Sequence, residues 1–316
     1  MPVTTPSADG HVYTTMAQLM ALEPRARGLS FIARQPLSSI LSGNHASRLR
    51  GRGLSFDELR RYQPGDDLRH LDWRASLRHG KPFVRSFTEE RDRPTLVVVD
   101  QRMSMYFGSQ RDFKSVTAAH LAALCAWIAF HAGDRVGGLV IGAERVEHIA
   151  PLRSRSRVQL FFTALVRANH ALSVAGADQE HDRLLDQVLR NCIASAGHDH
   201  LICLISDFAG VSEQTLGLLR QLRSHNDVIA LQVYDPIALQ LPDHGRLTIT
   251  QGSAQAELEV GRRQVHRPLS DFLSGRLRDV ADLLRRSQVP LMLISSGDDS
   301  LEQLRRELGR LSEVAR

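Results

Sequence analysis

The sequence predicts an α/β fold in which helices cover both faces of a doubly wound, mainly parallel sheet. Short apolar runs of strand length, several of them closing on an aspartate, alternate with longer segments whose apolar residues recur three and four positions apart. This alternation is typical of a parallel sheet with helical crossovers. A chain of 316 residues with 42% hydrophobic content is long enough for one large domain and an appendage.

The regular part of the chain begins at residue 94. Strands are predicted at 95–100, 135–141, 145–149, 200–207, 227–235 and 289–294, and helices at 112–131, 155–168, 180–195, 212–224, 269–286 and 299–313. Two short runs at 247–250 and 256–260 predict a hairpin, carried by an insertion at about 236–262. We therefore expect residues 94–316 to form the α/β domain.

Residues 1–93 are expected to form a separate N-terminal region with a small, partly β appendage. A short helix is predicted at 15–23, ended by Pro24, and a strand at 81–88. Between them, the segment 51–73 (GRGLSFDELRRYQPGDDLRHLDW) is dense in charge and has no helical or alternating apolar period. It is not predicted to form an ordinary buried element.

The charge pattern argues against a nucleic-acid binder. The net charge is +5, but only Lys81 and Lys114 are lysines, and acids interleave with the arginines in most segments. No basic stripe carries the aromatic side chains that stack on bases. Nucleic-acid binding stays an alternative, which predicts a steep salt dependence of association.

The apolar segments and the cysteines predict a cytoplasmic protein without direct membrane insertion. No run approaches the ~18–20 apolar residues that a membrane span needs, and the first residues lack the pattern of a signal peptide. Cys125, Cys192 and Cys203 lie in apolar periodic segments, which is typical of reduced, buried thiols.

The chemistry is expected where two predicted strands end in an acid. Asp100 and Asp207 close such strands, and ligands of doubly wound sheets bind at the carboxyl ends of strands, near the switch in strand order. The turn D100-Q-R-M-S104 resembles the metal-ion-dependent adhesion site of von Willebrand factor A domains. That resemblance implies a Mg²⁺ or Mn²⁺ held by Asp100, Ser104 and Asp207.

Two hydroxyl positions of that pattern are lost here. Arg102 stands where the pattern has its first serine, and Ala177 stands where a threonine is expected. A guanidinium close to two carboxylates repels a dication and can neutralise them through bidentate hydrogen bonds. Our hypothesis is that Arg102 is a built-in cation in a degenerate site; a bound metal and plain decay of the site are the alternatives.

A wider set of motifs resembles the bacterial domain-of-unknown-function-58 family. The signature segment 51–91 matches it at positions that include Arg60, Tyr62, Pro64, Gly65, Asp66, Asp67, Arg69, Asp72 and Trp73, and later matches include Phe107 and Gly108. The resemblance implies a von Willebrand A-like core and a chaperone-like or assembly role with a MoxR-type AAA+ ATPase. The resemblance also implies other von Willebrand A-domain proteins as partners.

The signature residues are expected to be structural. Asp66 is predicted to cap a turn, and Asp67 and Asp72 to pair with Arg60, Arg69 or Arg74. Trp73 is predicted to be the buried anchor of the segment.

The resulting expectation is a non-enzymatic adaptor without a resident cofactor. The alternative is a metal-dependent hydrolase, or a ligand-binding domain that depends on a divalent ion.

Overall fold

The computed structural model describes residues 10–31, 54–63, 68–89, 93–143, 145–173, 184–242, 246–251, 254–260 and 263–314. The chain divides into a larger unit, Met1–Pro36 with Arg93–Arg316, and a smaller unit, Leu37–Asp92. Among the described residues, the larger unit contains a six-stranded and a two-stranded sheet, and the smaller unit contains another two-stranded sheet.

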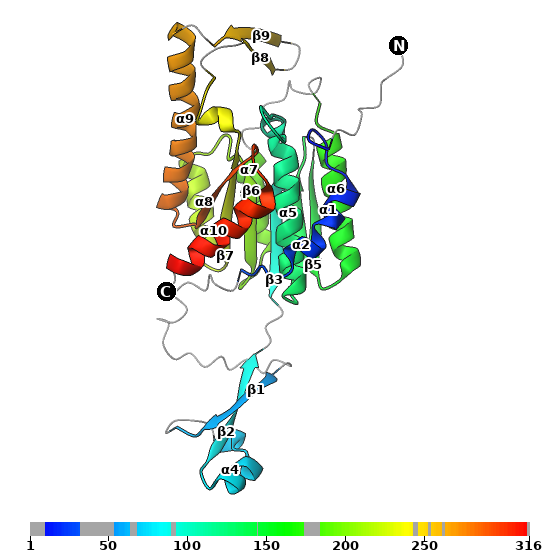
Figure 1. The fold of residues 1–316 in the computed structure, drawn as a ribbon, viewed down its shortest axis with the longest axis vertical. Coiled ribbons are helices and arrows are strands. Elements are labelled where there is room, and N and C mark those ends of the chain that lie inside the picture. The colour runs from blue at the N-terminus through cyan, green and yellow to red at the C-terminus, as the bar shows by residue number, and fades with distance from the viewer. Residues whose placement is uncertain are drawn as a thin grey trace. The chain divides into compact units, whose positions relative to one another are not determined.

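The larger unit contains the predicted sheet. Within its described residues, six strands lie in the order β10-β7-β6-β3-β4-β5, and all neighbours are parallel except β4 and β5. Their bounds are β3 (Pro94–Asp100), β4 (Arg135–Ile141), β5 (Val146–Leu152), β6 (Leu201–Ser206), β7 (Asp227–Tyr234) and β10 (Leu291–Ser295) (Figure 1). The chain leaves β3 toward β4 and later returns on its other side as β6, so the strand order reverses between β3 and β6.

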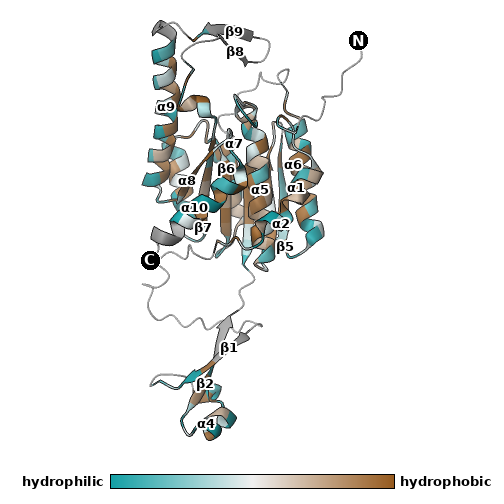
Figure 2. Ribbon diagram, in the orientation of Figure 1, coloured by the Kyte–Doolittle hydropathy of each residue, from teal (hydrophilic) through white to brown (hydrophobic). Residues whose placement is uncertain are grey.

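Helices cover both faces of this sheet, as predicted. One face carries α1 (Met16–Ala21), α2 (Glu23–Ala26), α5 (Lys114–His131), α6 (Arg155–His170) and α10 (Ser300–Val314). The other carries α7 (Leu184–Ser195), α8 (Glu213–Arg223) and α9 (Arg263–Arg286). Alternate residues of β3 supply both cores: Val97 and Val99 pack on the first face, Leu96 and Val98 on the second. Figure 2 shows mostly apolar residues along these strands.

The N-terminal helices belong to the larger unit, which corrects the predicted boundary of an N-terminal region at residue 93. Trp127 of α5 is fully buried, and its indole N–H donates to the Leu19 carbonyl over 3.1 Å. Leu19 and Leu22 pack into the same core, because α5 is apolar on every side and needs cover beyond the sheet. Pro24 does not end a helix; it lies in the first turn of α2, where its missing N–H costs nothing.

The smaller unit contains three elements that the sequence analysis missed: a strand, a 3-10 helix and an α-helix. β1 (Leu54–Arg61) and β2 (Phe83–Glu89) pair antiparallel, and η2 (Leu68–His70) and α4 (Trp73–His79) lie between them in the chain (Figure 1). β1 has no alternating apolar pattern of its own, so only its pairing with β2 shows that it is a strand. The predicted strand at 81–88 is confirmed as β2.

The expected pairing inside the signature segment is wrong for Asp72. Asp72 caps α4 by accepting from the Ala75 backbone N–H over 3.0 Å, and it pairs with Arg85 over 2.8 Å. The Ala75 N–H and the Arg85 guanidinium hold the pKa of Asp72 below its usual value. Trp73 is 69% exposed and is not a buried anchor. Pro64, Gly65, Asp66 and Asp67 lie outside the described residues.

The predicted hairpin is present as β8 (Arg246–Gln251) and β9 (Ala254–Glu259), which pair antiparallel. Two short 3-10 helices, η3 (Met103–Met105) and η5 (Pro236–Ala238), follow β3 and β7.

Among the described helices, none has the length and apolar character required to cross a bilayer.

Candidate functional site

The reversal of strand order brings the two predicted aspartates to one edge of the sheet. Asp100 is the last residue of β3, and Asp207 directly follows β6, which pairs with β3 in parallel. The sequence expectation that both carboxylates lie near the switch point is met. Ser104, in η3, also reaches this edge and donates its hydroxyl to Asp207 Oδ1 over 3.2 Å.

The Arg102 side chain is hydrogen-bonded to both oxygens of the Asp100 carboxylate. Its Nη2 and Nε donate to Asp100 Oδ2 over 2.7 and 3.1 Å, and Nε also donates to Oδ1 over 3.0 Å. The backbone N–H of Arg102 adds a bond of 2.9 Å to Oδ1. The Arg102 side chain is 2% exposed and that of Asp100 is 0% exposed, so this is a buried, charge-assisted pair.

A strained turn after β6 holds the pair in place. Ser206 donates its hydroxyl to Asp100 Oδ2 over 2.6 Å and accepts from the Phe208 N–H over 2.8 Å. Phe208 has a φ of 54°, a left-handed conformation that is unfavourable for a residue with a Cβ. The turn directs the Ala209 carbonyl to Arg102 Nη2 over 3.3 Å and the Ala209 N–H to Asp207 Oδ1 over 3.0 Å.

Asp207 is neutralised by a second cation, Lys114. The Lys114 ammonium donates to Asp207 Oδ2 over 2.8 Å, and the two side chains are 14% and 11% exposed. Burial by itself raises the pKa of Asp207, but the Lys114 charge and hydrogen bond and the Ala209 N–H outweigh it and lower the pKa to about 2.

Sequence reasoning missed Lys114, although a signal was present. Lys114 is the first residue of α5, where the helix dipole favours an anion and opposes a cation. It is also one of two lysines in a chain whose other positive side chains are arginines. A lysine in that unfavourable place indicates a nearby carboxylate, and the structure identifies it as Asp207.

The side chains at this edge do not fit a divalent ion as they are arranged. The Asp100 oxygens accept from Arg102 and Ser206, and the Asp207 oxygens accept from Lys114, Ser104 and the Ala209 N–H. A dication would have to displace two cations from the carboxylates that it needs as ligands. Of the two carboxylates that the sequence suggested, Arg102 is hydrogen-bonded to Asp100, whereas Asp207 is bonded to Lys114. Ala177 lies outside the described residues.

A third aspartate ties the neighbouring loops together. Asp235 follows β7, is 4% exposed, and accepts from the backbone N–H of Ser109 over 2.8 Å and from its hydroxyl. It also accepts from the Ile237 N–H and the Ser296 hydroxyl, each over 3.0 Å. The loop between η3 and α5 is therefore anchored to the ends of β7 and β10.

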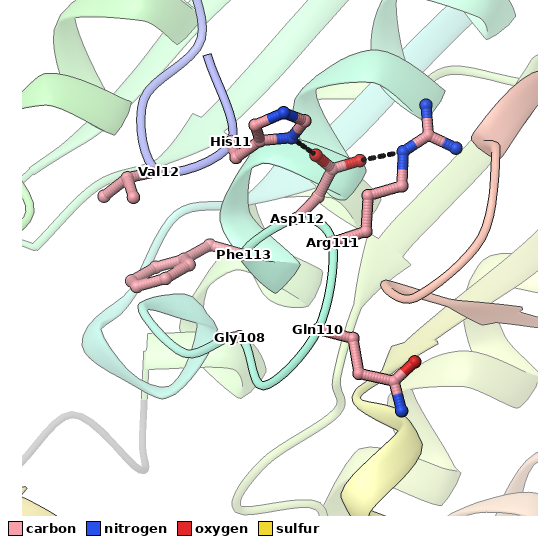
Figure 3. Close-up of a pocket in the computed structure, with 7 residues that line it drawn as sticks. All are labelled: His11, Val12, Gly108, Gln110, Arg111, Asp112 and Phe113. Carbon is pink, nitrogen blue, oxygen red and sulfur yellow. Dashed lines mark hydrogen bonds and ion pairs between the residues drawn. The ribbon is translucent and has the colours of Figure 1, made fainter. Parts of the chain in front are cut away.

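Beside this loop lies a pocket of about 270 Å³ (Figure 3), lined by His11, Val12, Gly108, Gln110, Arg111, Asp112 and Phe113. Its main polar feature is Asp112, which is bonded to His11 Nδ1 at 2.6 Å and lies 3.6 Å from Arg111 Nε. None of the predicted site residues lines it. The pocket therefore lies between the N-terminal segment and the loop that precedes Lys114.

Two large apolar side chains are exposed on the loops at this edge. Phe107 is 40% exposed and Leu239 is 59% exposed. Phe107 lies two residues before Ser109, and Leu239 follows η5, so both flank the Asp235 anchor. Gly108 is required beside Phe107, because a Cβ there would lie 2.7 Å from the Asp112 carbonyl oxygen and from the Phe113 ring.

The Asp207 carboxylate predicts an acid-sensitive contribution to stability. Its pKa is lowered in the folded chain from 3.8 to about 2, so the contribution is present above pH 4 and is lost as the pH falls through 2. We expect it to amount to about 2 kcal/mol. Urea unfolding between pH 2 and pH 6 should show a steeper loss for the wild type than for Asp207→Asn. Equal slopes would contradict the pairing with Lys114.

Comparison with known proteins gives a family match and uncharacterised relatives. A family model described as "Protein of unknown function DUF58" matches residues 58–285. "Uncharacterized protein Rv1480" of Mycobacterium tuberculosis is 27% identical over 281 residues, which cover 88% of this chain and 86% of the relative. "Uncharacterized protein Mb1516" of Mycobacterium bovis matches to the same extent, 27% over 281 residues with 88% and 86% covered.

Solved structures match more distantly. BatB of Bacteroides thetaiotaomicron, described as a conserved hypothetical protein, aligns with a TM-score of 0.44 and 11% identity, over 69% of this chain and 98% of that chain. An aerotolerance-related membrane protein of Bacteroides fragilis aligns with a TM-score of 0.39 and 11% identity, over 68% and 98%.

Proposed function

The chain belongs to the DUF58 family, and from that premise we propose that it is a non-enzymatic adaptor for a MoxR-type AAA+ ATPase in chaperone-like assembly. The edge of the sheet that carries Asp100, Ser104 and Asp207 is the docking face. The proposal includes a cytoplasmic location, no resident cofactor, and von Willebrand A-domain proteins as further partners.

The observation that carries the proposal is the internal neutralisation of this edge. Asp100 is paired with Arg102, and Asp207 with Lys114. Asp235 is saturated by four hydrogen bonds. General acid–base or metal-assisted hydrolysis needs a carboxylate with an open side toward a substrate or an ion. The oxygens of these three carboxylates are already bonded to cations or to loop residues. This arrangement favours a rigid binding surface over a catalytic centre.

The exposed side chains of the same loops support protein binding. Phe107 and Leu239 present apolar surface on either side of the hydrogen bonds that Asp235 accepts. Aromatic side chains are enriched at the centres of protein interfaces, and rigid loops lose little entropy on docking. The choice of an AAA+ ATPase rests on the family resemblance.

The proposal predicts that Phe107→Ser with Leu239→Ser weakens binding of the MoxR-type ATPase from the same genome. We expect the wild type to bind in at least one nucleotide state, and the double variant to lose at least about tenfold in affinity, since each apolar side chain removed from an interface costs of the order of 1 kcal/mol. Isothermal titration with the purified ATPase, with ATP, with ADP and without nucleotide, measures this.

Leu160→Ser is the matched control, because Leu160 is 51% exposed on α6, away from the docking face. It should leave affinity unchanged. A wild-type chain that binds the ATPase in no nucleotide state would overturn the adaptor role. Binding that survives in the double variant would keep the adaptor role but place docking elsewhere.

A further inference from the structure

The smaller unit carries an apolar face of its own. Trp73 and Leu77 are one turn apart on α4 and are 69% and 83% exposed. Residues at this spacing lie side by side on a helix. Exposed apolar patches of this kind, when bordered by polar residues, mark interaction sites.

Hydrogen bonds attach α4 to the hairpin without covering this face. The Ser76 hydroxyl donates to the Asp72 carbonyl over 2.7 Å and accepts from the Phe83 N–H of β2 over 2.9 Å. The Asp72 N–H donates to the Phe83 carbonyl over 2.8 Å. Trp73 and Leu77 stay 69% and 83% exposed although neighbouring Ser76 is bound to β2, so their stripe is left uncovered within this unit.

A basic border lies beside the apolar stripe. Arg74 and Arg78 form the next stripe of α4, and Lys81 follows Gly80, which ends the helix in the left-handed conformation with a φ of 64°. All three cations are exposed, and none pairs with a carboxylate among the described residues. The charge on this border is therefore available to a partner.

We propose that the α4 face, formed by Trp73, Arg74, Leu77, Arg78 and Lys81, binds an acidic protein segment that places apolar side chains against Trp73 and carboxylates against the arginines. Trp and Arg are the residues that most often dominate binding energy at protein interfaces. The positive border selects an acidic partner and repels a basic one. The helix has only 7 residues, which is short for a helix that lies in a membrane surface.

Selection from a displayed library of random 16-residue peptides tests the proposal. The full chain is the target, and the chain with Trp73→Ser and Leu77→Ser is the counter-target. We expect the enriched peptides to combine Asp or Glu with aromatic or aliphatic residues. For one such peptide, labelled with fluorescein, Trp73→Ala should weaken binding at least about thirty-fold. Arg78→Glu should weaken it at least about tenfold and reduce its salt dependence.

These variants change exposed side chains, and circular dichroism checks that each one folds. Leu160→Ser on α6 is the matched control and should bind the peptide as the wild type does. An absence of acidic sequences among the enriched peptides would overturn the proposal, as would binding that Trp73→Ala leaves unchanged.

Two further arms identify other occupants of the face. Vesicles that contain phosphatidylserine test for a lipid surface. If they bind the wild type but not Trp73→Ala, and no acidic peptide binds, the face belongs to a lipid surface and the proposal is overturned.

Acrylamide should quench the fluorescence of Trp73 readily and that of the buried Trp127 poorly. A protected Trp73 in the free monomeric chain would show that the chain covers its own face, and in a self-associated chain that a second copy does. Because Phe107 and Leu239 lie in the larger unit, failure here leaves the test of the adaptor role intact.

Discussion

Replacing Arg102 with alanine should cost about 3–5 kcal/mol of folding free energy, the range observed when one partner of a buried ion pair is removed. Among the described residues, the change leaves the Asp100 carboxylate, which is 0% exposed, with the Ser206 hydroxyl and the backbone N–H of residue 102 as donors. Urea unfolding at neutral pH measures the loss. Arg111→Ala is the control, since Arg111 is 43% exposed and its ion pairs are 3.5–3.6 Å long. It should cost less than about 1 kcal/mol.

The double variant Asp100→Asn with Arg102→Met tests whether the loss comes from an unpaired buried charge. It removes both charges together, so most of the stability lost in Arg102→Ala should return. If Arg102→Ala and Arg111→Ala cost the same small amount, the buried pair does not stabilise the edge of the sheet. If the double variant is no more stable than Arg102→Ala, an unpaired buried charge on Asp100 is not what destabilises Arg102→Ala.

The same position tests whether Arg102 is a built-in cation. Arg102→Ser restores a D-x-S-x-S spacing after β3, and we expect Mn²⁺ or Mg²⁺ to raise the melting temperature of this variant but not of the wild type. Adding Asp207→Ala to the variant should remove the effect. Micromolar binding of Mn²⁺ by the wild type that disappears in Asp207→Ala would contradict the built-in cation.

Truncating Asp235 should be the other large loss, about 3–4 kcal/mol, because donors from three segments, two of them buried, lose their acceptor. The segments are the loop at Ser109, the start of η5 at Ile237, and Ser296 after β10. Urea unfolding of Asp235→Ala measures the stability. Hydrogen exchange should speed up in residues 106–113, since Asp235 accepts two of the hydrogen bonds that hold this loop.

Asp235→Asn keeps one acceptor oxygen and should lose about half as much stability as Asp235→Ala. Asp282→Ala is the surface control: its side chain is 61% exposed and pairs only along the helix with Arg285. It should change stability by less than about 1 kcal/mol. Unchanged exchange in residues 106–113 of Asp235→Ala would show that the loop is held by other contacts.

Local patterns predicted most of the larger unit. Its apolar runs and helical spacings gave the strands and helices from residue 94 onward, and the hairpin at 246–259, because each depends on residues within a few positions of one another. Where prediction failed, the determining contact is distant. β1 is a strand because it pairs with β2. Leu19 packs beside Trp127, which lies 108 positions further along the chain.

The residues of the candidate site also divide into those that local sequence predicts and those that contacts distant in sequence decide. The sequence by itself determined that Asp100 and Asp207 close buried strands, and that Arg102, two positions from Asp100, is near enough to neutralise it. Only the tertiary structure decided that Lys114 meets Asp207 from 93 positions away. It also decided that Asp72 pairs with Arg85 and that Trp73 is exposed. Strand periodicity is a property of neighbouring residues, whereas ion pairing and exposure depend on which surfaces the folded sheet brings together.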